Sequence, residues 1–480
     1  MMRRMSVSAA RRDIWPVLLF LFCAFPVLVM SALLTPMGQS PDETSHIARA
    51  DSLLHGNILL IHKTVEEPGA EAPIKVVGTK INAGLSAVAW GNYTQIYGHA
   101  VSAANNLSAL HQVQWQHQRV FINIPNTAAY FPLAYIPGAV GLGIGKAIGL
   151  SPFNAVTLGR LATALAYVLI GAAALALANF GRPVLLAILL FPISLFLGGT
   201  FDQDGILIAL SCLACAGLTR ETEFGRAVAF ASFVVVLLAK PPYLPMLAIF
   251  ALPLARPGFW RRAGTVIVAS LPVIVWAVIV ILFVSVPVIK PSYHPGILFT
   301  GPAGTMFSQT DATANLHIML ADKARFITLP LHTLHIFGFG LLQEVIGKLG
   351  YKNLCFPDWF YECWWSAGVL ALVSLLFTRR SIMSPIPMAL LNNIAVLGLF
   401  VITAWLVILS FYFSWTQVGQ DFIEGLQGRY VLLLLPFLPL AIPALGAWLP
   451  EAVPMFPIFL LGLLDIGYVP LKLAQFYYVH

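Results

Sequence analysis

A short acidic motif near the N-terminus has residue types that suit proton transfer beside an anion. Residues 40–49 read Ser-Pro-Asp-Glu-Thr-Ser-His-Ile-Ala-Arg. Within a helix, spacings of four and three residues place Asp42, His46 and Arg49 on one face. A carboxylate can act as a general base, and histidine and arginine can bind a phosphate. We therefore predict Asp42 or Glu43 as a catalytic base, with His46 and Arg49 as substrate-binding residues.

The same motif also has a purely structural interpretation. Ser40 and Glu43 have the spacing of a capping box, and Pro41 stands at the favoured first position of a helix. In this interpretation the acids only begin a helix and interact with its dipole. The sequence leaves both interpretations open, and the capping role applies more to Glu43 than to Asp42.

A second pair of acids, Asp202 and Asp204, lies in a short turn between two apolar segments. Two carboxylates at this spacing can share a divalent cation, Mg²⁺ or Mn²⁺, with a lipid phosphate. The alternative is a solvated turn in which Asp204 caps the following helix. A metal site at Asp202 and Asp204 is therefore an expectation, and this cation is the one cofactor that the sequence suggests.

Two basic residues border apolar segments farther along the chain. Lys240 precedes two prolines and Tyr243, and a lysine at such a depth either extends to the interface or binds an anion. Arg429 either anchors the interface or binds a phosphate through its planar set of donors. The substrate-binding residues predicted from these two segments are Lys240, Tyr243, Gln427, Arg429 and Tyr430.

The elements that position these residues are predicted to be membrane helices. The 480 residues are 59% hydrophobic and 10% charged, with a mean hydropathy of +0.84, whereas soluble domains carry about 25% charged residues. Long apolar runs indicate helices rather than a barrel. The net charge of +7 comes from small dispersed clusters that orient membrane proteins, so nucleic acid is not an expected partner. We predict an all-α polytopic protein, with residues 1–480 forming one integral-membrane domain.

Arginine placement predicts the topology. Four arginines precede the apolar run 14–34, which indicates an uncleaved anchor with its N-terminus in the cytoplasm. Residues 128–150 are apolar but rich in proline and glycine. If they lie at the outer interface, the basic clusters of the later loops all face the cytoplasm. About eleven spans then follow, with a C-terminus outside and two large outer loops, 35–152 and 289–362.

Three further features belong to this topology. The stretch 227–255 is interrupted at Lys240 and predicts two short helices that meet at an outward-facing break. Cys355 and Cys363 fall in the second outer loop, where a disulfide between them is one of two open outcomes. Asp465 interrupts the last apolar run, and the sequence gives it no role.

Several short motifs together resemble one family. Pro41-Asp42-Glu43-x-x-His46-x-x-Arg49 after a first span is similar to the opening of the bacterial domain-of-unknown-function 2142 membrane proteins. The other matching motifs are Lys240-Pro241-Pro242-Tyr243, Gly347-Lys348-Leu349-Gly350, Pro357-Asp358-Trp359 and Gly425-Leu426-Gln427-Gly428-Arg429-Tyr430. They extend over most of the chain, and their number and order make the resemblance more specific than any one of them.

That family is grouped with the GT-C glycosyltransferases. The resemblance implies a GT-C-like bundle with a large first outer loop and juxtamembrane helices, in the bacterial inner membrane. It implies an enzyme that takes a sugar from a polyprenyl-phosphate carrier, facing the periplasm, and passes it to a glycan, lipid or protein acceptor. The catalytic acid would be Asp42 or Glu43. The alternatives are a transporter or flippase of lipid-linked sugars and a non-catalytic protein of envelope assembly.

Overall fold

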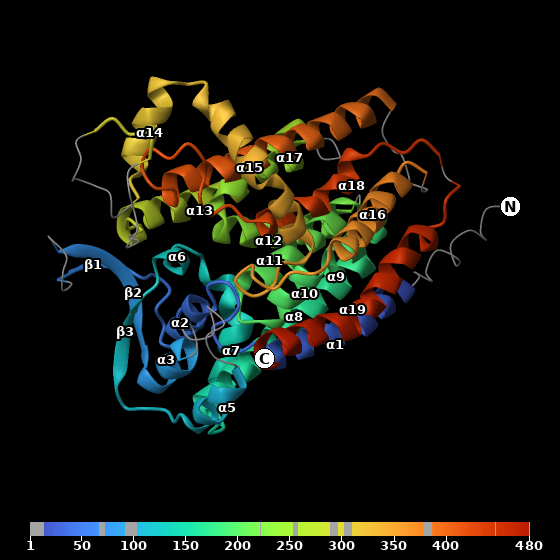
Figure 1. Ribbon diagram of the computed structural model, residues 1–480. Coiled ribbons are helices and arrows are strands. Elements are labelled where there is room, and N and C mark those ends of the chain that lie inside the picture. Colours follow the sequence, from blue (N-terminus) through green and yellow to red (C-terminus); the bar gives the residue numbers. More distant parts are fainter. Residues whose placement is uncertain are drawn as a thin grey trace.

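The chain is mostly helical, as Figure 1 shows for the computed structural model. The structure describes residues 14–66, 73–91, 103–220, 222–252, 258–288, 296–301, 310–377, 386–446 and 448–479. Long helices form a bundle, and the segment between α1 and α8 gathers at one end of it (Figure 1). The N-terminal arginines used to orient the first span lie outside the described residues.

Six helices among the described residues are long and apolar enough to cross a membrane. They are α1 (Trp15–Leu34), α8 (Pro152–Leu177), α13 (Phe259–Ile279) with its continuation to Val284, α15 (Arg325–Gly347), α17 (Ile386–Ser414) and α19 (Ala452–Tyr478). A seventh candidate span is the pair α9 (Arg182–Leu190) and α10 (Pro192–Gly199), which are bent by 59° at a break before Pro192. The chain is therefore a polytopic helical membrane protein.

The predicted number of about eleven spans is not confirmed in the described part of the chain. Several apolar runs form shorter helices, because prolines interrupt them or because their terminal residues lie in loops. At about 1.5 Å per residue, the 16 residues of α11 reach about 24 Å, less than the bilayer core of about 30 Å. Conversely, α15 has the length and composition of a span although it lies inside the predicted loop 289–362.

These shorter elements complete the bundle. They are α11 (Gln203–Leu218), α12 (Glu223–Ala239), η3 (Pro241–Ala251), η4 (Val280–Val284), α14 (Ala312–Ala321), α16 (Asp358–Ser374), η5 (Gly428–Leu433), η6 (Leu435–Phe437) and α18 (Leu438–Ala441). The predicted break at Lys240 is confirmed, because α12 ends at Ala239 and the 3₁₀ helix η3 begins at Pro241. Proline lacks the N–H that would continue the α-helix.

The segment between α1 and α8 contains a small sheet, which the prediction of an all-α fold missed. Its elements are α2 (Glu43–Leu54), β1 (His62–Val65), β2 (Ile74–Asn82), α3 (Ala83–Trp90), α5 (Ala103–Gln112), β3 (Arg119–Asn123), α6 (Pro125–Ala128), η2 (Pro132–Tyr135) and α7 (Ile136–Ala147). The strands are antiparallel in the order β1-β2-β3, with Gly78 opposite Asn123. Helix-length hydropathy windows do not detect strands this short.

Helix α7 bears on the predicted interfacial position of residues 128–150. It has only 12 residues, which corresponds to about 18 Å and is too short to cross a bilayer. It packs along α8 and α2 instead. The short helices of this segment therefore agree with a juxtamembrane arrangement.

Close packing of α10 against α11 fixes the turn that carries the second acidic pair. A Cβ built on Gly205 would lie 2.6 Å from the Gly198 backbone, so only glycine permits this approach. Small residues let membrane helices pack backbone to backbone. This close packing sets the position of the turn between the two helices.

The two loop cysteines and the acid of the last helix also stand out in the sequence. Cys355 and Cys363 are exposed free thiols, with no disulfide between them in the structure. Asp465 lies within α19 and is fully buried, and the structure gives it no functional role.

Candidate active site

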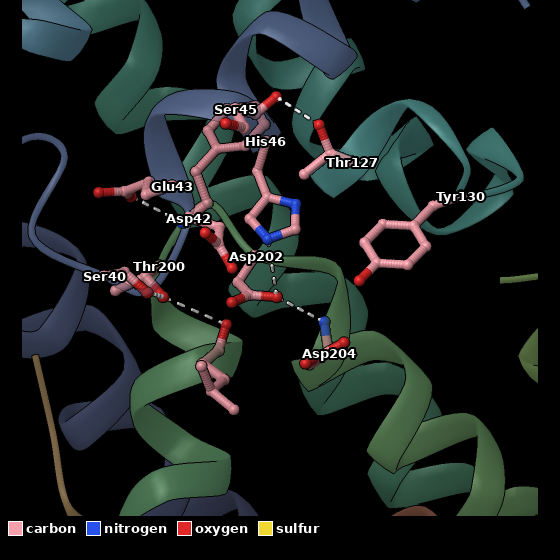
Figure 2. Close-up of polar contacts among 12 residues, drawn as sticks. Ser40, Asp42, Glu43, Ser45, His46, Thr127, Tyr130, Thr200, Asp202 and Asp204 are labelled. Carbon is pink, nitrogen blue, oxygen red and sulfur yellow. Dashed lines mark hydrogen bonds and ion pairs between the residues drawn. The ribbon is translucent and has the colours of Figure 1, made fainter. Parts of the chain in front are cut away.

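The acidic and basic motifs predicted from separate parts of the sequence meet at one place. The start of α2, the turn before α11, the break between α12 and η3, and the start of η5 converge there. Figure 2 shows Asp42, His46, Asp202 and Asp204 pointing toward one another, with the ring of Tyr130 beside them. We call Asp42, His46, Asp202, Asp204, Lys240 and Arg429 the polar cluster.

Asp42 is the accessible acid of the polar cluster. It precedes α2 with φ at 58°, in the left-handed region that residues other than glycine rarely adopt, and its side chain caps no helix N–H. Asn126 Nδ2 donates to Asp42 Oδ1 at 2.8 Å, and Arg429 Nη2 lies 3.6 Å from Oδ2. The side chain remains 40% exposed. This carboxylate is held in place yet open to a substrate.

Glu43, the other candidate base, is committed to structure. Arg160 binds it through two hydrogen bonds of 2.7 Å, and the backbone N–H groups of Gly38 and Phe201 donate to it at 3.0 and 2.9 Å. Its side chain is fully buried. Both oxygens are therefore occupied, and no substrate proton can reach them.

The predicted capping box is wrong. The Ser40 hydroxyl lies 3.0 Å from Thr200 Oγ1 rather than on a helix N–H, and Glu43 points toward Arg160. Arg160 also donates to the carbonyls of Ala32, Thr35 and Pro36. Its single guanidinium thus ties α8 to the end of α1 and the start of α2. Arg160 is the lone arginine of an apolar run, and this feature of the sequence indicates a buried partner or a function.

Asp202 and Asp204 are buried and paired with cations. Asp202, and not Asp204, is the N-cap of α11, accepting from the Asp204 N–H at 2.7 Å. Asp202 lies 3.6 Å from His46 Nε2 and 3.3 Å from Arg429 Nη1. Asp204 lies 3.1 Å from Lys240 Nζ and 3.5 Å from Arg429 Nε. Each of the two acids therefore has at least one basic partner.

These ion pairs do not fit the predicted divalent-cation site. Arg429 and Lys240 already neutralise the carboxylates that a cation would need. Across the described ranges, no group of three or more His, Cys, Asp or Glu residues is placed to hold a metal.

Burial and charge act differently on the two acids. Burial raises the pKa of Asp202, and His46 and Arg429 offset only part of this effect. Burial acts on Asp204 too, but Lys240 and Arg429 outweigh it and lower the pKa of Asp204. Burial alone would lower the pKa of Lys240, but Asp204 raises it overall. Asp204 and Lys240 therefore form a charged pair.

The two predicted phosphate-binding cations are enclosed. Arg429 contacts all three aspartates with a side chain only 6% exposed. Lys240 is 10% exposed and lies 4.4 Å from the ring centroid of Tyr130 and 5.4 Å from that of Tyr430. Desolvated cation–π contacts of this kind stabilise a buried ammonium. Both cations organise the polar cluster.

Tyrosines set the walls of the site. The Tyr135 hydroxyl lies 2.7 Å from His46 Nδ1, and the Tyr243 hydroxyl donates to the Tyr430 carbonyl at 2.6 Å. The Tyr430 ring stacks on Phe411 at 4.8 Å. Tyr130 and Tyr135, like Asn126, come from the segment after β3, and no spacing in the sequence indicated them.

Arg49 does not join the polar cluster. Its guanidinium donates to the carbonyls of Ile58 at 2.7 Å and Tyr130 at 3.2 Å, and it is fully buried. It shapes the chain after α2 and is not available to a substrate. The predicted substrate-binding role of Arg49 is therefore replaced by a structural one.

A family comparison covers this whole arrangement. The family model described as "Predicted membrane protein (DUF2142)" matches residues 25–441, which include every residue of the polar cluster. The chain belongs to the DUF2142 family. No curated protein and no solved structure matches it.

Next to the polar cluster, this DUF2142 protein has an apolar cavity of about 420 Å³. We call it the α15–α17 groove, because Leu334 to Val345 of α15 and Ala404 to Ile408 of α17 form two of its walls. The third wall runs from Leu426 to Leu434 and includes Gln427 and Tyr430. This cavity thus lies between α15, α17 and η5.

Proposed function

We propose that this protein is a membrane glycosyltransferase that transfers a sugar from a polyprenyl-phosphate carrier to an acceptor hydroxyl with inversion. Asp42 carries the proposal, as an accessible carboxylate held in a rare backbone conformation beside a buried network of charges. Unusual backbone conformations that the surrounding structure enforces cluster at active sites. A general base of this kind typically contributes about 10²–10⁴-fold in rate.

In the proposed reaction the acceptor oxygen attacks the anomeric carbon of the carrier-linked sugar. The bond from that carbon to the phosphate oxygen breaks, polyprenyl phosphate leaves with the electron pair, and Asp42 takes the hydroxyl proton. Asn126 and Arg429 fix the orientation of the Asp42 carboxylate toward the acceptor. The α15–α17 groove, which reaches Tyr430 beside Arg429, supplies an apolar place for the carrier chain.

We place this site on the periplasmic side of the bacterial inner membrane. The arginine distribution supports this orientation, because it keeps the basic clusters in the cytoplasm. In this orientation α15 belongs to the outer segment 289–362, and the shorter apolar helices beside the other long spans would supply the remaining crossings of an eleven-span GT-C-like bundle. The acceptor remains a glycan, lipid or protein hydroxyl.

The test is transfer by the purified protein in proteoliposomes supplied with polyprenyl-phosphate sugars. We expect release of polyprenyl phosphate with the native chain and at least about a 100-fold slower release with Asp42→Asn. The matched control is Glu66→Gln, an exposed acid outside the polar cluster. Near-normal transfer by Asp42→Asn would refute the proposed base. Movement of the lipid between leaflets without product would instead indicate a flippase.

A further inference from the structure

One task in the proposed reaction still lacks a residue, namely the binding of the carrier phosphate. Arg429 and Lys240 are almost fully buried and each already contacts carboxylates. A phosphate could reach them only by displacing an aspartate. The motif Gly347-Lys348-Leu349-Gly350 supplies one other lysine, and Lys352 follows it two residues later. Both lysines line a neighbouring cavity that the polar cluster does not use.

We call this cavity of about 370 Å³ the lysine pocket, because Lys348 and Lys352 both line it. The loop that carries them is closed by two backbone hydrogen bonds between Leu349 and Leu354, of 2.9 and 3.2 Å. Lys352 has φ at 65°, the left-handed region again. The tight loop therefore directs both lysines to one cavity at the cost of an unfavourable backbone conformation.

The lysine pocket contains two glutamates beside the two lysines, and Lys352 remains accessible. Lys352 Nζ lies 3.6 Å from Glu344 Oε1 and its side chain is 41% exposed. The other oxygen of Glu344 accepts the Gly428 N–H at 2.8 Å, and Glu424 accepts the Gln417 N–H at 3.1 Å. Both glutamates are thus engaged by backbone amides. Lys348 forms no ion pair with any residue that the structure describes.

The lysine pocket and the α15–α17 groove adjoin. Leu341 and Leu426 line both cavities, so the apolar groove leads directly to the two lysines. Glu344, which borders the pocket, also holds the Gly428 N–H next to Arg429. An apolar cavity that ends at two accessible ammonium groups has the chemistry to bind an amphiphile with an anionic head.

We propose that the two cavities together bind one polyprenyl phosphate, with its chain in the α15–α17 groove and its phosphate at Lys348 and Lys352. This inference rests on the proposed function and names where the carrier phosphate is held. Lys348 and Lys352 lie outside the polar cluster, so the proposal assigns the carrier phosphate to these lysines and the acceptor proton to Asp42.

Binding can be measured without transfer, by thermophoresis of the full-length protein in detergent with farnesyl phosphate as the probe. A charge-assisted contact is worth enough to change affinity about tenfold. We expect Lys348→Gln/Lys352→Gln to weaken binding about 10- to 100-fold. The control Lys323→Gln, at an exposed lysine before α15, should bind as the native protein does.

A substitution at Gly338 tests the α15–α17 groove separately from the lysines. A Cβ at Gly338 would meet no atom within 4 Å, so Gly338→Trp should fold and fill the groove. We expect it to abolish farnesyl phosphate binding. Gly368→Trp, at a helical glycine of α16 with equally open space, should not change binding.

Each outcome decides the inference. Farnesol, which lacks the phosphate, should bind weakly, and the lysine substitutions should not change its affinity. Millimolar inorganic phosphate should not displace farnesyl phosphate. Displacement by inorganic phosphate alone, or native-like binding by the double-lysine and Gly338→Trp variants, would overturn it. Transfer that needs Asp42 but neither lysine leaves the proposed function intact and refutes this inference. Binding that depends on the lysines, together with transfer that does not depend on Asp42, supports this inference and refutes the proposed base.

Discussion

Arg429 lies 3.6 Å from Asp42 and joins the accessible acid before α2 to a segment near the other end of the chain. The same guanidinium reaches Asp202 and Asp204 at 3.3 and 3.5 Å. Its planar fork of donors contacts the three carboxylates in a fixed geometry, which the point charge of a lysine does not reproduce. Arg429 therefore sets the position of η5 relative to α2 and α11.

Replacing Arg429 should destabilise the fold as well as stop transfer. In Arg429→Gln, Asp202 and Asp204 lose a cation in a buried environment, and removing one partner of a buried ion pair costs about 3–5 kcal/mol. Arg429→Lys keeps the charge but not the geometry, so its loss should be smaller. Thermal unfolding in detergent would measure both. Native-like unfolding of Arg429→Gln would contradict the assigned role.

Asp204 and Asp202 should differ in their effect on stability and in its pH dependence. Lys240 and Arg429 outweigh burial and lower the pKa of Asp204. Its carboxylate therefore stabilises the fold above the unfolded pKa of about 3.9, and this contribution is lost as the pH falls through the folded pKa. We expect Asp204→Asn to lose about 3–5 kcal/mol at pH 7.

For Asp202 the sign is opposite. Burial raises its pKa, so stability falls as the pH rises from the ordinary to the raised pKa. Asparagine also caps helices well, so Asp202→Asn should be less destabilising at pH 7 than Asp204→Asn. Unfolding at pH 7 would test the order, and unfolding measured from about pH 3 to pH 8 would test the opposite pH dependences of the two acids. An equal loss in both variants would show that the two acids are not distinguished as described.

Glu43→Gln should separate structure from chemistry. The neutral side chain leaves the buried Arg160 without its counter-ion, so stability should fall by about 3 kcal/mol or more. Transfer per folded molecule should stay within a few-fold, because Glu43 has no free oxygen to act as a base. The reverse pattern, native stability with lost transfer, would restore Glu43 as the candidate base.

The sequence indicated the members of the polar cluster but not their pairing. Asp42, Lys240 and Arg429 each border an apolar segment, where a charge is expensive unless it has a partner or a function. Their partners depend on how α2, α11, η3 and η5 approach one another, and a single sequence does not encode that approach in any local spacing. The small sheet was missed for a related reason, since its strands are short and pair across distant positions.

Arg49 shows the limit of predicting contacts from helical spacing. Asp42 precedes α2 in a left-handed conformation, so it does not continue the periodicity that placed it on one face with His46 and Arg49. His46 and Arg49 both lie inside α2, yet His46 lies 3.6 Å from Asp202 whereas Arg49 donates to the carbonyl of Ile58. A shared helix face therefore does not decide which partners two side chains contact, because those partners come from other segments of the chain.

The orientation of the bundle can be tested by cysteine labelling at the start of α12. Gly225 is unsuitable, because a Cβ there would lie 2.7 Å from the Gly217 carbonyl oxygen. Glu223 is a better position, since its side chain is 80% exposed and its ion pair with Arg261 spans 3.8 Å at the surface.

In a cysteine-free background, Glu223→Cys should react with an impermeant maleimide only after the cytoplasmic side is opened. Glu66→Cys, in the segment between α1 and α8, should react in intact spheroplasts. Labelling of the two positions from the same side would overturn the arrangement in which the polar cluster faces the periplasm.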